Sequence, residues 1–183
     1  APPQIMRTQS GEVLLKAADP ESEIYYTLDG SQPKKGGLKY KGPIKTSDGR
    51  VKIKALAYDG QTGKVSDVGE EQYDISKSKW EISNIADTAA YQMLDGDFNT
   101  AWQRPNKSTF EVVINLKETI DLLGFKYLPP QHWWEEGNII TNYQIYISND
   151  GINWGLTKEG EFANIKNNPV WQNILFDKPT VAK

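Results

Sequence analysis

Five Asp-Gly pairs divide this chain into short segments, and they constrain the fold more than any other feature. They are Asp29-Gly30, Asp48-Gly49, Asp59-Gly60, Asp95-Gly96 and Asp150-Gly151. Asp and Gly favour tight reversals because Gly adopts a positive φ without steric cost and the Asp side chain accepts hydrogen bonds from the turn backbone. A chain that reverses this often is expected to form short antiparallel strands.

The segments between these turns are rich in β-forming residues. In residues 51–58 the apolar side chains of Val51, Ile53, Ala55 and Ala57 share one parity, which is typical of a strand with one buried face. Further strands are predicted at 12–17, 24–28, 72–75, 110–116, 122–128, 143–148 and 171–176. Only 87–94 is compatible with a helix of one or two turns, with Asp87 as N-cap. Short strands at this spacing predict β-sandwiches or barrels.

A polar stretch, Ser76-Lys77-Ser78-Lys79, separates a strand-like segment from a new apolar start at Trp80. Such stretches commonly join domains. The sequence therefore predicts two tandem β-sandwich domains, at residues 1–76 and 79–183. The start at Ala1-Pro2-Pro3, without Met, looks like a cut inside a longer chain.

The overall charge excludes several classes of partner. The chain has 21 Lys and Arg against 24 Asp and Glu, a net charge of -3. We therefore expect no nucleic-acid partner and no attraction to an anionic membrane. Cysteine is absent, so disulfides, thiol chemistry and Cys-ligated zinc are excluded.

Oxygen-bearing side chains gather in the loop 94–102 around Gly96. Asp95, Asp97, Asn99 and Thr100 offer carboxylate, amide and hydroxyl oxygens, which are ligands that calcium prefers. Two interpretations stay open from the residues alone. The loop either holds a hard cation or is an ordinary turn in which Asx side chains cap their own backbone.

A saccharide site is predicted in the segment 127–138. Trp133 and Trp134 are neighbours, and neighbours on an extended segment point to opposite faces, so at least one indole is expected to be exposed. Flat aromatic rings stack on the C-H faces of sugars, while polar side chains pair with the hydroxyls. The alternative is that one Trp is buried and the other makes a packing contact. The residues predicted to bind carbohydrate are His132, Trp133, Trp134, Glu135, Asn138, Arg104 and Asn167.

Catalysis is not expected. The sequence contains no Gly-x-Ser-x-Gly elbow, no phosphate loop and no His-Glu-x-x-His motif. A glycosidase needs two carboxylates about 5 to 9 Å apart across a cleft, which the adjacent Glu135 and Glu136 do not supply by themselves.

The first domain resembles the immunoglobulin-like domain found near the C-terminus of chitobiase and other bacterial glycosidases. The resemblance rests on Tyr25-Tyr26-Thr27-Leu28-Asp29-Gly30-Ser31 with Pro33, followed by Tyr40-Lys41-Gly42-Pro43-Ile44. It implies a structural role, and a spacer is the expectation.

The second domain resembles the discoidin, or coagulation factor type C, family, which includes the family 32 carbohydrate-binding modules. Three motifs carry this resemblance: Asp95-Gly96 with Thr100-Ala101-Trp102, the run 110–116, and 143–154, which ends in Asp150-Gly151-Ile152-Asn153-Trp154. It implies a jelly-roll with ligand loops at one end and, for Trp102 and Trp154, a place in the core. By the same resemblance a structural calcium is expected on Gln92, Asp95, Asp97 and Thr100.

Relatives usually continue past the segment that matches 178–183 into a last strand, which supplies a further acidic calcium ligand. Here the sequence stops at Lys183. The expectation is a discoidin-type domain truncated at its C-terminus, with a sheet and a cation site left incomplete.

Together these features predict a non-catalytic carbohydrate-binding module. By resemblance it belongs to a secreted bacterial glycoside hydrolase of the α-L-fucosidase or β-N-acetylhexosaminidase type and targets it to an oligo- or polysaccharide. The chain is expected to be monomeric and exported, in the periplasm, at the cell surface or outside the cell. The alternatives are a protein or membrane adhesion module and an architectural domain that docks on its own catalytic domain.

Overall fold

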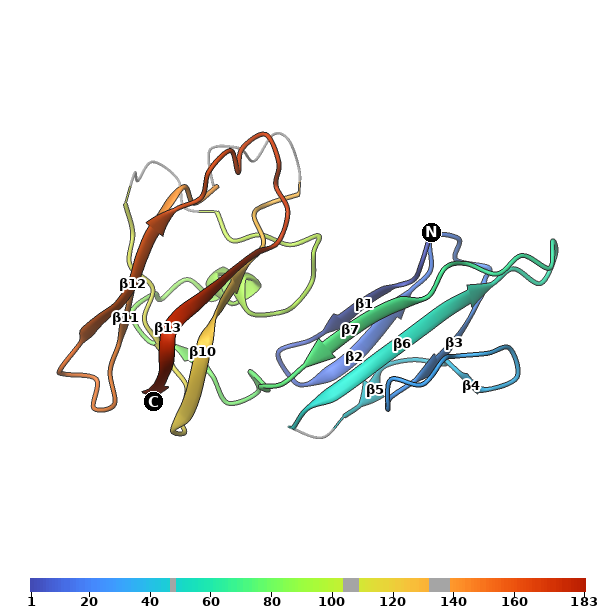
Figure 1. The fold of residues 1–183 in the computed structure, drawn as a ribbon, viewed down its shortest axis with the longest axis horizontal. Helices are drawn as coiled ribbons and strands as arrows, with labels where there is room; N and C mark the ends of the chain where they lie inside the picture. The colour runs from blue at the N-terminus through green and yellow to red at the C-terminus, as the bar shows by residue number, and fades with distance from the viewer. Residues whose placement is uncertain (47–48, 104–108, 132–138) are drawn as a thin grey trace. The chain divides into compact units, whose positions relative to one another are not determined.

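The computed structural model describes residues 1–46, 49–103, 109–131 and 139–183, and these form an all-β protein, as the sequence predicts (Figure 1). Contacts divide the chain into two compact units. Unit 1 comprises Ala1–Ser78 with Leu94–Asp97, and unit 2 comprises Lys79–Met93 with Phe98–Lys183. Among the described residues, no helix is long and apolar enough to cross a membrane.

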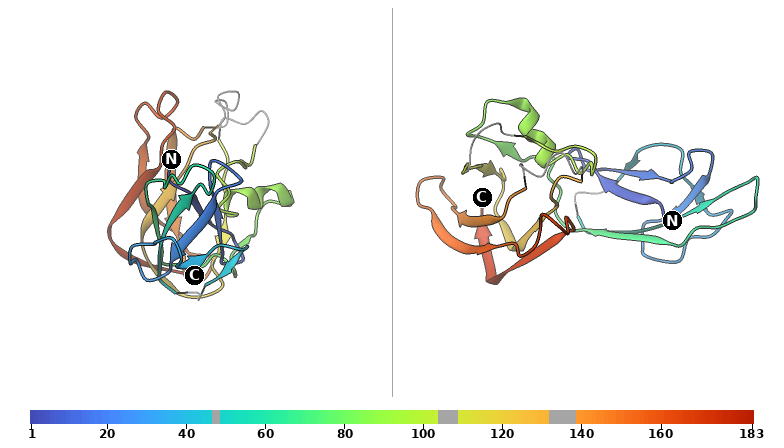
Figure 2. Two further views of the ribbon diagram at one scale, coloured as in Figure 1. Left: turned by 90° about the vertical axis from the view of Figure 1, so that its right-hand side faces the viewer. Right: turned by 90° about the horizontal axis from the view of Figure 1, so that it is seen from above.

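Unit 1 contains two antiparallel sheets that lie in separate layers (Figure 2). The three-stranded sheet has the order β1-β2-β5, with β1 at Gln4–Arg7, β2 at Glu12–Lys16 and β5 at Ile44–Lys45. The four-stranded sheet has the order β4-β3-β6-β7, with β4 at Leu38–Lys39, β3 at Glu23–Thr27, β6 at Val51–Tyr58 and β7 at Gly69–Tyr73.

The core of unit 1 lies between these sheets. Val13, Ile53 and Ala55 are completely buried, with no exposed surface. Ile53 and Ala55 belong to the alternating strand β6, so the predicted inward parity of that strand is confirmed. Burial of a side chain as large as Val13 or Ile53 stabilises a fold by about 1.5 to 3 kcal/mol.

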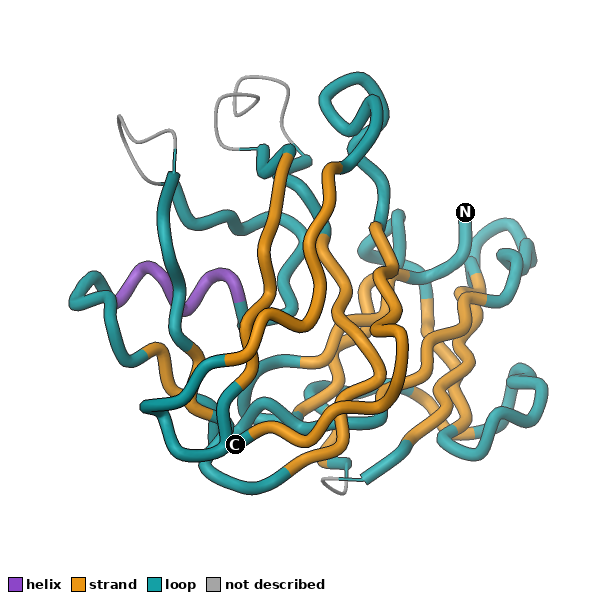
Figure 3. The backbone as a smooth tube through the Cα atoms, turned by 60° about the vertical axis from the view of Figure 1, so that its left-hand side comes forward, coloured by secondary structure: helices purple, strands orange, loops and turns teal. Residues whose placement is uncertain are grey.

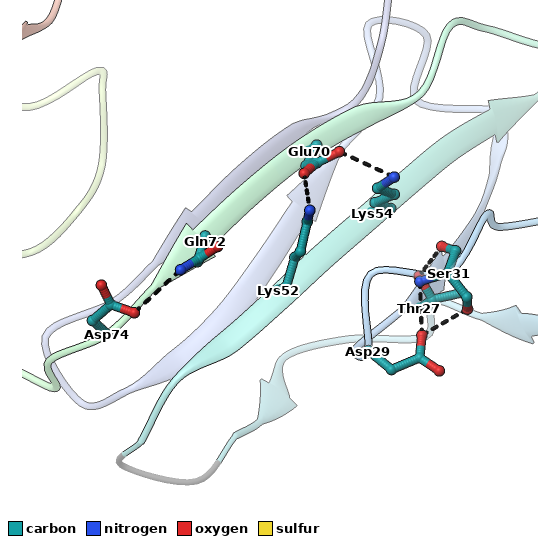
Figure 4. Close-up of polar contacts among 8 residues, drawn as sticks. All are labelled: Thr27, Asp29, Ser31, Lys52, Lys54, Glu70, Gln72 and Asp74. Atoms are coloured by element: carbon teal, nitrogen blue, oxygen red, sulfur yellow. Dashed lines mark hydrogen bonds and ion pairs between the residues drawn. The ribbon is translucent and has the colours of Figure 1, made fainter.

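The outer face of β6 and β7 carries complementary charges (Figure 4). Lys52 and Lys54 on β6 both pair with the carboxylate of Glu70 on β7, with nitrogen–oxygen distances of 2.7 and 3.1 Å. These two lysines hold the pKa of Glu70 below its ordinary value, the hydrogen bond from Lys52 contributing most. The side chains of Lys52 and Glu70 are half-exposed, so their pair orients the side chains more than it stabilises the sheet, while Lys54 is more deeply buried.

The described part of unit 2 forms three two-stranded antiparallel sheets. They pair β8 (Glu81–Ile82) with β9 (Ile114–Asn115), β10 (Ile120–Tyr127) with β13 (Gln172–Ala182), and β11 (Asn142–Ile147) with β12 (Gly155–Glu161). In β10 and β13 the register runs from Ile120 opposite Ala182 to Tyr127 opposite Gln172. Residues 178–182 therefore belong to a paired strand.

An aromatic cluster joins β10 and β11 to the segment that follows β12. The ring of Tyr143 lies 5.2 Å from Phe125 and 4.8 Å from Phe162, and Tyr127 stacks on Phe162 at 5.3 Å. Such ring pairs add about 0.5 to 1.5 kcal/mol to the effect of area burial. The cluster fixes the point from which the loop after β12 leaves the sheet.

Replacement of Gly124 by Ala is expected to destabilise unit 2 by about 1 to 3 kcal/mol. Gly124 follows a register shift in β10, and a Cβ there would lie 2.0 Å from the carbonyl oxygen of Ile174. Because the Cβ would clash with a backbone atom, the clash is removed only if β10 and β13 move apart. Chemical denaturation of Gly124→Ala against Gly155→Ala checks this, since the nearest atom to a Cβ at Gly155 is 3.9 Å away. Equal loss in both variants would contradict it.

Several elements differ from the sequence-based prediction. The helical segment is a 3₁₀-helix, η1 at Thr88–Met93 (purple in Figure 3), and Asp87 does cap it by accepting a hydrogen bond from the Ala89 N–H at 3.0 Å. The predicted strand at 110–116 is confined to Ile114–Asn115. Strands β1, β4, β5, β8 and β12 were not among the predicted ones; most of them are two to five residues long, too short for a clear alternating pattern.

Candidate functional site

Three loop segments meet at one end of unit 2, where β10 and β12 end and β13 begins (Figure 1). The side-chain amide of Gln131, after β10, donates hydrogen bonds to the carbonyls of Pro129 at 2.8 Å and Pro169 at 3.0 Å. Phe98 contacts Trp171. We call residues 98–100, 129–131 and 164–171 the loop end.

Trp171 presents an aromatic surface at the loop end. This residue is 45% exposed although it stands directly before strand β13. The ring of Phe98 meets it edge to face, with ring centroids 5.9 Å apart and an interplanar angle of 85°. An indole held by an aromatic edge is an ordered platform, and its free surface suits the apolar C-H face of a sugar.

The loop before Trp171 is ordered by its own hydrogen bonds. Asn164 adopts a left-handed conformation, with φ of 55°, and its carbonyl accepts the N–H groups of Asn167 and Asn168, each at 3.1 Å. The side-chain amide of Asn167 donates to the side-chain oxygen of Asn164 at 2.7 Å. Asn tolerates this conformation better than most residues. The turn orders the loop shortly before Trp171, and its three Asn residues are exposed.

Asn167 is the one predicted carbohydrate-binding residue that the structure describes, and it lies in this loop. His132, Trp133, Trp134, Glu135, Asn138 and Arg104 lie outside the described residues. Trp171 was not predicted as a ligand-binding residue because it is the first residue of the predicted strand 171–176 and was assigned to that strand. A signal was present, since Pro169 two residues earlier delays regular pairing and keeps the start of that run at the rim.

The predicted calcium ligands are distributed over both units. Contacts assign Gln92 and Thr100 to unit 2, and Asp95 and Asp97 to unit 1. The carboxylate of Asp95 accepts a hydrogen bond from the Asp97 N–H at 2.9 Å. This is the contact expected if the loop is an ordinary turn in which an Asx side chain caps its own backbone. Within the described residues, no group of three or more His, Cys, Asp or Glu side chains is arranged to hold a metal. The donor types fit calcium, and the site stays a prediction.

The prediction that Trp154 is a core residue is wrong. Trp154 is 45% exposed, and its indole N–H donates to the carbonyl of Gly151 at 3.2 Å, so it closes the turn between β11 and β12 from outside. Trp102 is half-buried rather than buried. Its indole donates to Asp87 at 3.1 Å and its ring packs edge-on against Phe110. Trp154 thus braces a turn, and Trp102 is tied to the residue that caps η1.

Asp150 holds the turn that carries Trp154. Its carboxylate accepts the backbone N–H groups of Asn153 and Ile152, each at 2.8 Å, and bonds the side chains of Asn153 and Ser148. These bonds, led by the Asn153 N–H, hold the pKa of Asp150 far below its ordinary value.

Acid is expected to weaken the turn at Asp150. A folded-state pKa below the unfolded value, about 3.9 for Asp, means that the carboxylate stabilises the fold above pH 4. That contribution is lost as the pH falls toward the folded-state pKa. Melting temperatures measured from neutral pH to about pH 2 should therefore fall further for the wild type than for Asp150→Asn, which has no carboxylate to protonate. Parallel curves would contradict the assignment.

The fold defines a class: an all-β protein of two units, with several loops gathered at one end of the second. Residues 13–73 match the Fn3 associated family, and residues 74–183 match the F5/8 type C domain family. The second match covers more than half of the chain, which therefore belongs to the F5/8 type C, or discoidin, family. Domains of this family are often carbohydrate-binding or adhesion modules and are typically non-catalytic.

Proposed function

We propose that this protein is a non-catalytic carbohydrate-binding module whose site is the loop end of unit 2. The observation that supports this most directly is the exposed indole of Trp171, braced by Phe98 and preceded by the ordered Asn164–Asn168 turn. An aromatic plane stacks on the apolar C-H face of a sugar, and exposed amide groups pair with its hydroxyls. Trp133, Trp134 and their polar neighbours, which the sequence predicts to bind sugar, are part of the proposal on that prediction alone.

In this proposal the module serves a secreted bacterial glycoside hydrolase, of the α-L-fucosidase or β-N-acetylhexosaminidase type. Unit 1 would act as the spacer, and unit 2 would hold the enzyme near glycan. A single shallow sugar site binds weakly, on the order of 0.1 to 1 mM, so its effect is to raise the local substrate concentration. The support is the resemblance of both domains to modules of such enzymes, together with the two family matches.

Three outcomes of one screen separate this function from its rivals. The protein is applied to a glycan array and to liposomes containing phosphatidylserine, with Trp133→Ala and Trp134→Ala beside the wild type. We expect glycan retention without liposome binding, because a net charge of -3 disfavours an anionic surface. Liposome binding without glycan binding would favour adhesion, and binding to neither would favour an architectural domain. Both results would overturn the proposal.

Calcium is proposed as a structural ion rather than a participant in recognition. If the loop 92–100 binds it in the folded state alone, saturating calcium should raise the melting temperature of the protein and EDTA should lower it. At calcium 100 times above Kd the gain is about 2.7 kcal/mol. Magnesium at the same concentration is the control. Identical melting curves with calcium and with EDTA would contradict an occupied site.

A further inference from the structure

Unit 1 contains an open cavity that the spacer role does not require. Its volume is about 450 Å³, within the range of small-molecule sites. Tyr26, Leu28 and Leu38 supply the apolar part of the lining, and Leu38 is 60% exposed on the edge strand β4. The polar part of the lining comes from Thr27, Asp29, Ser31, Gln32 and Lys34.

The walls of this cavity are held in place. Tyr26 pairs with Leu38 in the antiparallel register of β3 and β4, so both apolar walls sit on strands. Asp29 accepts the backbone N–H of Ser31 at 2.9 Å, and Thr27 donates to the Ser31 carbonyl at 2.7 Å (Figure 4). The Gly37 N–H donates to the carbonyl of Lys34 at 3.0 Å, which fixes the backbone of the rim. Sites on such pre-formed elements lose little entropy when a ligand binds.

Hydrogen-bonding groups of the lining are available to a ligand. Among the residues that the structure describes, the side chains of Tyr26, Gln32 and Lys34 have no hydrogen-bond or ion-pair partner. The neighbouring lysines, in contrast, already have partners. Lys39 pairs with Glu23, and the Nζ of Lys35 lies 3.7 Å from the ring centroid of Tyr58. The cavity therefore combines an apolar wall with a phenol, an amide and an ammonium group.

The charge around the cavity is opposite to that of the whole chain. Residues 23–41 carry four lysines against two acids, Glu23 and Asp29, for a local charge of +2, whereas the chain has a net charge of -3. Hydrogen bonds from the Ser31 hydroxyl and then its N–H lower the pKa of Asp29, so this acid stays ionised and turned into its own loop. The charged side chains of the lining are those of Lys34 and Asp29, and Asp29 is already bonded to Ser31. The charge available to a ligand is therefore the cation of Lys34, which favours an anionic ligand.

From the cavity, its unpaired donors and its local charge we propose a second binding site in unit 1, specific for a saccharide that carries a carboxylate. The sugar ring contacts the apolar wall of Tyr26 and Leu38, and its carboxylate pairs with Lys34, while Gln32 donates to a hydroxyl. This site is independent of the loop end in unit 2.

The test uses the full chain carrying Trp171→Ala, so that the proposed site in unit 2 is impaired and failure of one proposal is distinguishable from failure of the other. Digalacturonate is titrated into the ¹⁵N-labelled protein and amide shifts are followed by NMR, with galactobiose as the neutral match. We expect saturable shifts at Ser31, Gln32 and Leu38 with digalacturonate. The affinity for galactobiose should be lower by about tenfold or by a larger factor.

Two charge-matched variants sharpen this test. Lys34→Gln is expected to weaken digalacturonate binding about 3- to 10-fold, whereas Lys16→Gln, which removes an exposed charge that does not line the cavity, leaves it unchanged. Raising the salt to about 0.5 M should weaken binding to the wild-type cavity, because an exposed ion pair is screened. No saturable shifts at the cavity, equal affinity for galactobiose, or equal losses in the two lysine variants would overturn the proposal.

Discussion

Trp171→Ala is expected to lower the affinity for the glycan that the array identifies by tenfold or more, on the order of 1.4 kcal/mol. The substitution removes the aromatic plane at the loop end while leaving Phe98 and the Asn164–Asn168 turn in the chain. Aromatic anchors typically carry much of the binding energy of a small contact surface. Isothermal titration calorimetry with the purified glycan measures the loss.

The chain offers a matched control for this experiment. Trp154 has the same 45% exposure as Trp171 and also belongs to unit 2, but it lies in the turn between β11 and β12, outside the loop end as defined. Trp154→Ala should therefore retain glycan affinity within about twofold. Circular dichroism checks that both variants keep their fold. Comparable losses in the two variants would show that Trp171 is not a specific contact.

Ile53→Ala is expected to destabilise unit 1 by about 2 to 5 kcal/mol. Ile53 lies in β6, on the face between the two sheets, with no exposed surface. The substitution removes buried apolar atoms and leaves a cavity that a sandwich fixed by two sheets cannot fully close. Denaturation followed by far-ultraviolet circular dichroism measures the change.

Tryptophan fluorescence makes this prediction specific to unit 1. All six tryptophans lie at or after residue 80, so their emission reports on unit 2. If the units unfold independently, Ile53→Ala lowers the midpoint of a circular-dichroism component and leaves the fluorescence midpoint in place. Val65→Ala, at a position 56% exposed, should change neither by more than about 0.5 kcal/mol. A fluorescence shift as large as the circular-dichroism shift would contradict independent unfolding.

The β architecture is predictable from the sequence because it depends on local chemistry. The alternation of Val51, Ile53 and Ala55 gives both the strand and its buried face, and the Asp-Gly pairs give reversals. Gly30, Gly96 and Gly151 do adopt positive φ, between 73° and 79°. Short edge strands such as β4 do not follow from local pattern, since two residues contain no period and pairing with β3 creates them.

The candidate site is less predictable because distant segments form it. Nothing near Gln131 in the sequence indicates that its amide bonds Pro169, 38 positions later; the return of β13 alongside β10 brings the two together. The exposure of Trp154 shows the same limit. A motif identifies the turn at Asp150, but which side of that turn faces solvent depends on packing that local residues do not encode.

The central claim, glycan recognition at the loop end, is tested most directly by the indole N–H signals of the six tryptophans in a ¹H–¹⁵N spectrum. The glycan selected by the array is titrated into the wild-type protein after the signals are assigned by single substitutions. We predict that the Trp171 signal shifts in a saturable manner while the Trp154 signal stays in place. A bound glycan that leaves the Trp171 signal unmoved, or that shifts Trp154 instead, would contradict the proposed site.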